Sequence, residues 1–242
     1  MSGHSKWATI RRKKEATDGA RAKVFTKIGR EIAVVVREGG PDPNNNAKLR
    51  ELIAKAKANN VPNDNIDRII KKAAGDGDKT NYQSNVYEGY GPNGVAVIVE
   101  CLTDNKNRTA GDIRHYFDKF GGNLGTTGCV SFMFTSQGTI VMEYENQSEE
   151  KVMEDIFEAG ATDFSIEDDV IEASCEPNDV LTVAEAFRGM GYKVISAETE
   201  MVPSTYTKLT DEESIRKMTM LLEHLEDNDD VQNVYHNWEM DD

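Results

Sequence analysis

The chain has 242 residues, of which 38% are hydrophobic and 29% charged, and its formal net charge is −15. This length accommodates one large domain or two to three small ones, each with a buried core. The longest apolar runs, IAVVV at 32–36 and VAVIV at 95–99, are far shorter than the ~20 residues that cross a bilayer, so no membrane-spanning helix is expected.

Targeting signals and cysteines point to the cytoplasm. No apolar segment follows the basic start, so we expect no secretory signal, and Glu15 and Asp18 argue against a mitochondrial presequence. The cysteines Cys101, Cys129 and Cys175 are widely spaced, and each lies in an apolar, strand-like run. Thiols used as small hydrophobic side chains are typical of a reducing compartment, so we expect a cytoplasmic protein.

Charge is distributed very unevenly along the chain. Residues 1–75 carry 17 Lys and Arg against 8 Asp and Glu, a balance of +9, whereas the remaining residues carry 11 against 35, a balance of −24. Such an asymmetry indicates an interaction surface at one end, and a basic surface suits an anionic partner. The acidic remainder would repel nucleic acid and so would confine contact to the basic end.

The first 75 residues are predicted to form a basic helical bundle. Apolar residues recur at helical spacing over 25–36, and two glycines then end the helix. Further helical patterns cover 49–56 and 62–75, and a short helix is predicted around Trp7 and Ile10. The cations of the first long helix share the side opposite its apolar residues: Lys23, Lys27, Arg30 and Arg37.

Beyond a linker predicted at 75–85, strands and helices alternate. The pattern predicts a strand at 94–102, a helix at 109–120, a strand at 129–134, a βαββαβ series over 138–200, and a strand, helix and strand at 205–209, 211–226 and 231–236. The βαββαβ order is that of the ferredoxin-like motif.

The predicted fold class is α+β. It consists of a basic N-terminal helical bundle followed by two ferredoxin-like α+β domains, the third domain being inserted into the second. The expected boundaries are 1–78 for the helical domain, 79–134 with 205–242 for the discontinuous domain, and 135–204 for the inserted one. The alternative is one continuous mixed sheet across 80–242.

Two glycine-rich segments resemble nucleotide-binding loops. GYGPNG at 89–94 fits G-x-G-x-x-G, but the dinucleotide motif follows a strand and opens a helix, whereas this segment precedes a strand and its Pro92 lacks an amide hydrogen. GGNLGTTG at 121–128 lacks the Gly-Lys-Ser/Thr of a P-loop. It is predicted to be a helix cap and turn, with an anion-binding nest of amides as the alternative.

No residue pattern indicates catalysis. The four histidines, His4, His115, His224 and His236, have no His or Cys partner at metal-ligand spacing. No nucleophile lies beside a base. We therefore expect no metal, no cofactor and no enzymatic activity.

The strongest functional signal is the basic N-terminal stretch, which includes RRKK at 11–14. Clustered Lys and Arg neutralise phosphates and release counterions, and an aromatic side chain can stack on an exposed base. Trp7 is either such a stacking group or part of the bundle's core, and a solvated basic face is the alternative for the cations. The candidate nucleic-acid-binding residues are Lys6, Trp7, Arg11, Arg12, Lys13, Lys14, Arg21, Lys23, Lys27 and Arg30.

At SGHSKWATIRRKK the chain resembles the YebC family, bacterial proteins related to the mitochondrial translational activator of cytochrome c oxidase. The likeness continues at VFTKIGREI (24–32), YEGYGPNGVAVIVECLTDNKNRT (87–109) and GGNLGTTGCVSFMF (121–134) and covers nearly the whole chain. The resemblance implies a helical N-terminal domain, two α+β domains and no enzymatic activity. It also implies a DNA-binding transcriptional regulator, or a translation factor at the ribosome.

By the same resemblance, the family's basic motif falls on Lys6, Arg11, Lys13 and Lys14. The chain departs from the family at Arg12, where histidine is frequent, and at Gly19-Ala20, where another basic residue is common.

Three functions follow from these observations. A DNA-binding regulator presents a helix to the major groove, usually from a two-fold dimer, whereas an RNA- or ribosome-associated factor needs only a charged, shape-fitting surface with stacking groups. A protein-binding adaptor would instead use the acidic domains. The absence of clear helix-turn-helix spacing and of a dimerisation heptad favours RNA and a monomer, while the resemblance favours DNA.

Overall fold

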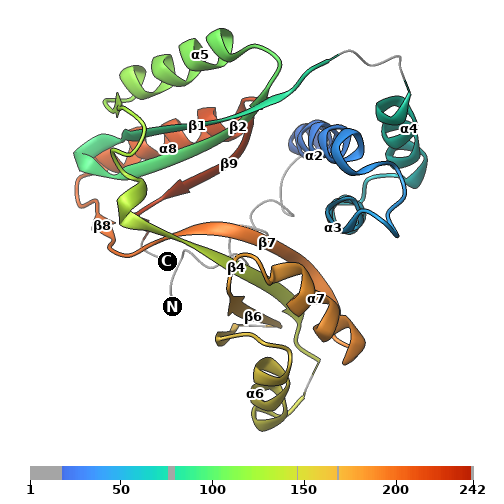
Figure 1. Ribbon diagram of the computed structural model, residues 1–242. Coiled ribbons are helices and arrows are strands. Elements are labelled where there is room, and N and C mark those ends of the chain that lie inside the picture. The colour runs from blue at the N-terminus through green and yellow to red at the C-terminus, as the bar shows by residue number, and fades with distance from the viewer. Residues whose placement is uncertain (1–17, 76–79, 146, 168, 241–242) are drawn as a thin grey trace.

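A computed structural model describes residues 18–75, 80–145, 147–167 and 169–240, with the backbone alone for 18–22. Figure 1 shows a helical bundle beside two α+β units. The predicted fold class is confirmed, because helices come first and two separate four-stranded sheets follow. The short helix predicted around Trp7 and Ile10 lies outside the described residues.

The helical bundle contains three described helices: α2 (Asp18–Gly39), α3 (Ala47–Ala58) and α4 (Asn63–Ala74). Their apolar stripes form one buried cluster that includes Ile28, Ile32 and Leu49. The side chain of Asn46 connects two of the helices. Its Oδ1 accepts the amide of Leu49 at 3.1 Å and thereby caps α3, while its Nδ2 donates to the carbonyl of Val35 in α2 at 2.8 Å.

The first α+β unit has a four-stranded antiparallel sheet in the order β3-β1-β2-β9. Its strands are β1 (Gln83–Tyr90), β2 (Ala96–Thr103), β3 (Asn123–Leu124) and β9 (Val231–His236). Helices α5 (Lys106–Lys119) and α8 (Glu212–Asp227) bury their apolar side chains against it, in a cluster that includes Phe117, Met218 and Leu225.

Three strand predictions for this unit were wrong. Strand β1 was missed, because its sequence QSNVYEGY has no apolar alternation and its Val86 is 48% exposed. The predicted strand at 129–134 is a bend followed by the 3-10 helix η2 (Ser131–Met133), and only its last residue, Phe134, begins a strand, which belongs to the other sheet. The buried Val130 and Phe134 pack on the sheet of this unit without pairing to it. The predicted strand at 205–209 shrinks to β8 (Thr207–Lys208), which pairs only with β10 (Trp238–Glu239).

The connectivity of this sheet therefore differs from two βαβ halves. Strand β2, helix α5 and strand β3 form a split βαβ unit around β1, and α8 leads into β9 on the other side of β2. The sheet has a ferredoxin-like order in which the first strand of the unit, β1, occupies the place of the third.

The second α+β unit follows the predicted βαββαβ order. It runs through β4 (Phe134–Glu143), α6 (Glu149–Glu158), β5 (Asp163–Glu167), β6 (Val170–Cys175), α7 (Val180–Gly189) and β7 (Val194–Pro203). Its antiparallel sheet has the order β5-β6-β4-β7, and both helices pack on a core that includes Ile140, Ile156 and Phe187.

All four strands of the second sheet lie between β3 and β9 in the chain. We propose on this connectivity that the domain boundaries are 1–78, 79–134 with 205–242, and 135–204. The three units are called below the helical domain, the discontinuous domain and the inserted domain.

Candidate nucleic-acid interface

Most of the candidate binding residues lie at the very start of the chain. Those that lie outside the described residues are Lys6, Trp7, Arg11, Arg12, Lys13 and Lys14. Arg21 belongs to helix α2, in the part described by its backbone alone. The structure places the remaining three, Lys23, Lys27 and Arg30, along α2 at successive turns.

Three of the four cations whose side chains are described on α2 contact the end of α8 and the turn into β9, while the fourth, Arg37, donates to the carbonyl of Thr80. Lys23 Nζ lies 2.7 Å from Asp227 Oδ1, and Lys27 Nζ donates to the carbonyl of Glu226 at 2.5 Å. Arg30 donates to the carbonyl of Asp229 at 2.7 Å and forms an ion pair with Asp230. The side of α2 that the sequence assigns to nucleic acid thus faces the acidic end of α8.

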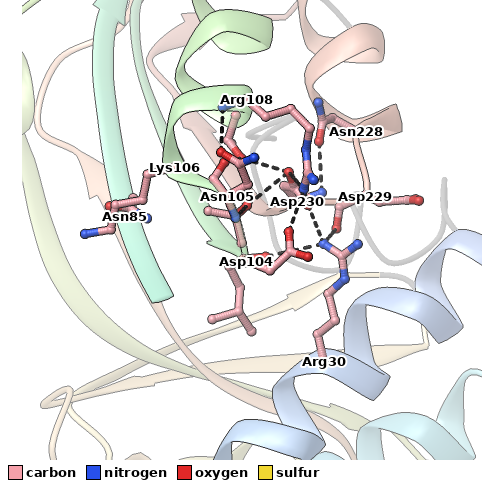
Figure 2. A network of polar contacts seen from close by, with 12 residues as sticks. Arg30, Asn85, Asp104, Asn105, Lys106, Arg108, Asn228, Asp229 and Asp230 are labelled. Carbon is pink, nitrogen blue, oxygen red and sulfur yellow. Dashed lines mark hydrogen bonds and ion pairs between the residues drawn. The ribbon is translucent and has the colours of Figure 1, made fainter. Parts of the chain in front are cut away.

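Asp230 is the centre of this contact (Figure 2). Its side chain is almost fully buried and accepts from Arg30 at 2.6 Å, from Arg108 Nη2 at 2.8 Å and from Thr109 Oγ1 at 2.8 Å. Burial alone would raise the pKa of this carboxyl, but these donors outweigh burial and hold its pKa below the usual value. Asp230 therefore stays ionised inside the contact.

Helix α2, the end of β2, helix α5 and the turn at 228–230 all meet at the Asp230 side chain. Arg108 and Thr109 lie in the first turn of α5, whose start is capped by Asn105. Asn228 accepts the amide of Asp230 at 2.9 Å and so shapes the turn that presents the carboxylate. Arg108 and Asp230 were not predicted as site residues, because residues so distant in the chain leave no local pattern in the sequence. Only the polar run 104–108, directly after a buried strand, could have suggested a site.

A second polar contact joins the helical domain to the inserted domain. Lys55 Nζ lies 2.7 Å from Glu198 Oε1 and 3.6 Å from Glu31 Oε2, and Arg188 forms two hydrogen bonds with the carboxylate of Glu51. Burial raises the pKa of Glu31. Burial alone would lower the pKa of Lys55, but the two carboxylates outweigh burial and hold its pKa above the usual value. The residues around these ion pairs line a partly open pocket of about 240 Å³.

The segment at 89–94 forms the turn between antiparallel β1 and β2, as predicted. It contains the 3-10 helix η1 (Pro92–Gly94), in which Asn93 and Gly94 have φ of 53° and 80°. A Cβ added to Gly89 would lie 2.6 Å from the carbonyl oxygen of Asn123, so this glycine is what allows β3 to approach β1.

Amides at the end of the glycine-rich segment 121–128 and just beyond it hold an anion, which is a side chain of this protein. The carboxylate of Glu88 accepts the amides of Gly128 at 2.8 Å, Val130 at 3.0 Å and Ser131 at 2.8 Å. Burial alone would raise the pKa of Glu88, but the three amide donors lower it below its usual value. Within the predicted nest at 121–128, Gly128 thus donates to the Glu88 carboxylate, and the amides of Gly122 and Gly125 donate to backbone carbonyls.

We expect Glu88→Gln to lower the free energy of unfolding by about 2 kcal/mol, because a neutral amide cannot accept all three buried backbone donors. Urea unfolding measures the change, and Glu158→Gln, at an exposed carboxylate, is the matched control. Equal stability of the two variants would contradict a structural role for Glu88.

Besides Arg37 of α2, the exposed cations among the described residues of the helical domain lie on α3 and α4. They are Lys48, Arg50, Lys57, Arg68, Lys71 and Lys72. Four residues, 59–62, separate the two helices, and Asn60 within them has a left-handed φ of 58°. A turn of this length is typical of helix-turn-helix units. This turn was not predicted from the sequence, because asparagine rather than glycine takes the left-handed position.

Among the described residues, no three His, Cys, Asp or Glu side chains come together so as to hold a metal ion. None of the described helices is long and apolar enough to cross a bilayer.

Known proteins of one family match this chain over nearly its whole length. Residues 5–76 match the family described as TACO1/YebC protein N-terminal domain, and residues 82–238 match TACO1/YebC second and third domain. A "probable transcriptional regulatory protein" of Acetivibrio thermocellus is 59% identical over 98% of this chain and 99% of its own. One of Ruminiclostridium cellulolyticum is 58% identical over 100% and 98%.

Among solved structures, the chain is similar to a conserved hypothetical protein from Aquifex aeolicus. The TM-score is 0.86 at 41% sequence identity, with 98% of each chain covered. A three-part fold, matching family segments and relatives of this identity lead to one conclusion: the chain belongs to the TACO1/YebC family.

Proposed function

We propose that this protein is a non-enzymatic, cytoplasmic regulator of gene expression that binds nucleic acid through its N-terminal helical domain. We further propose that it is a DNA-binding transcriptional regulator. The observation that carries the proposal is the division of charge, +9 over residues 1–75 against −24 over the remainder. The names of the relatives, probable transcriptional regulatory proteins, support the same role.

The physical basis is counterion release. Lys and Arg that neutralise phosphates release condensed cations, so binding weakens as salt rises. If the basic N-terminal stretch contacts about five phosphates, the slope of log K against log salt is roughly −3.5 to −4.5. The acidic domains repel the same phosphates and orient the bound protein.

The α3–α4 pair supports DNA as the target. Its four-residue turn suits a helix-turn-helix unit, in which the second helix reads base edges with residues near its start. The first turns of α4 carry Asn63, Asn65 and Arg68, which are side-chain types that pair with adenine and guanine.

A second candidate is an RNA- or ribosome-associated translation factor, and Trp7 supports it. A tryptophan beside Lys6 and close to RRKK is the combination with which proteins stack on an unpaired base and contact the adjoining phosphates. The monomer favoured by the sequence fits this candidate as well.

Crosslinking in cells, followed by sequencing of the DNA and RNA bound to the full chain, separates the two candidates. Enrichment of discrete DNA sites supports the transcriptional regulator. Enrichment of ribosomal or messenger RNA instead assigns the translation factor. Recovery of neither nucleic acid would reject both and favour a protein-binding adaptor.

Trp7→Ala tests the stacking group directly. If Trp7 stacks on a base, the variant should lose roughly 1–3 kcal/mol of affinity, with little change in the salt slope, because stacking releases no counterions. Fluorescence anisotropy at several salt concentrations and a thermal melt measure both quantities. A lower melting temperature with unchanged affinity would instead place Trp7 in the bundle's core.

A further inference from the structure

The basic face of α2 is already occupied by oxygen atoms. Over two turns of the helix, Lys23, Lys27 and Arg30 each contact the acidic segment 226–230. Their acceptors are two carboxylates, of Asp227 and Asp230, and two backbone carbonyls. Cations at this spacing on a helix are suited to a row of phosphate oxygens, and here protein oxygens take those places.

The charge of the two surfaces is complementary. Segment 226–230 has the sequence EDNDD, in which four of five residues are acidic. It belongs to the acidic remainder of the chain, whereas α2 belongs to its basic part. A row of phosphates along this face would have to lie where the segment lies against Lys23, Lys27 and Arg30, so the two compete for α2.

We propose that segment 226–230 masks a phosphate-binding face of α2, so that nucleic acid gains this face only when the helical domain separates from the discontinuous domain. The inference rests on the proposed function, since it concerns how the same basic domain is regulated. Binding would then proceed from the N-terminal stretch, with the face of α2 added by competition with the segment.

The individual contacts differ in strength. The Lys23 and Asp227 side chains are 39% and 70% exposed, so their ion pair is weak. The Arg30 and Asp230 side chains are only 17% and 5% exposed, and Asp230 also binds Arg108. The mask should therefore loosen at Lys23 first and hold longest at Arg30.

Asp227→Lys tests the mask in the full chain. Asp227 is the last residue of α8, where a lysine suits the helix dipole, so the variant should fold. We expect it to bind a fluorescein-labelled RNA or DNA duplex about 10-fold more tightly, because a larger fraction of molecules is open. Glu223→Lys is the matched control. It makes the same charge change at an exposed site of α8 that has no ion pair with the described side chains of α2.

The control separates release of the mask from a general electrostatic effect. An equal gain in Asp227→Lys and Glu223→Lys would overturn the mask while leaving nucleic-acid binding intact. No binding by the wild type or either variant would reject the proposed function itself, and the mask with it. Hydrogen exchange gives a second readout, since bound nucleic acid should increase exchange in 226–230. Unchanged or slower exchange there would also overturn the mask.

Discussion

Replacing Asp230 by alanine is expected to lower the free energy of unfolding by about 3 kcal/mol. The substitution leaves Arg30, Arg108 and Thr109 without the carboxylate that they share, and the site is almost fully buried. We place the loss at the lower end of the range for a broken buried pair, because the Arg108 side chain is 47% exposed and water can solvate it.

Asp229→Ala is the matched control for this prediction. The Asp229 side chain is exposed, and Arg30 reaches only its backbone carbonyl, which alanine keeps. Its effect should stay below about 0.5 kcal/mol. Urea unfolding of both variants measures the difference, and a loss at Asp230 no larger than that at Asp229 would contradict the central position of Asp230.

The same carboxylate gives the protein's stability a pH dependence with a definite sign. The pKa of Asp230 is lower in the folded state than its ordinary value of about 3.9. Its stabilising contribution is therefore complete above that ordinary value and is lost as the pH falls towards the folded-state pKa. Asp230→Ala should accordingly remove part of the wild type's loss of stability below about pH 4.

Sequence periodicity was enough to predict those helices and strands that are amphipathic on their own. The three long helices and the βαββαβ unit were predicted to within a few residues, because their apolar side chains recur at one spacing and face one core. The elements that were predicted wrongly lack such a pattern of their own. Strand β1 is recognisable only through its partners β2 and β3, and the apolar run at 129–134 packs on a sheet without pairing to it.

The candidate site was harder to predict than the fold. Helical spacing correctly placed Lys23, Lys27 and Arg30 on one side of α2, but no local pattern could reveal that segment 226–230 covers this side. A contact between residues some 200 positions apart depends on the packing of two domains. The charge division of the chain was the only sequence signal of this contact.

The double variant Lys13→Glu/Lys14→Glu should weaken nucleic-acid binding by about 100-fold at roughly 0.1 M salt, since each lost phosphate contact costs about tenfold under these conditions. The loss should be nearly uniform across sequences, and the salt slope should become shallower by about two, one for each contact. Anisotropy titrations at several salt concentrations measure both the affinity and the slope.

A matched control must change the net charge equally without touching the basic stretch. Arg114→Glu/Arg216→Glu does so, because both side chains are exposed on α5 and α8 of the discontinuous domain. At a Debye length of about 10 Å, charge reversal in another domain should be largely screened and should leave the salt slope unchanged. If both double variants lose affinity equally, only net charge matters. If neither loses any, the basic stretch is a solvated face, and residues 1–75 bind no phosphates through Lys13 and Lys14.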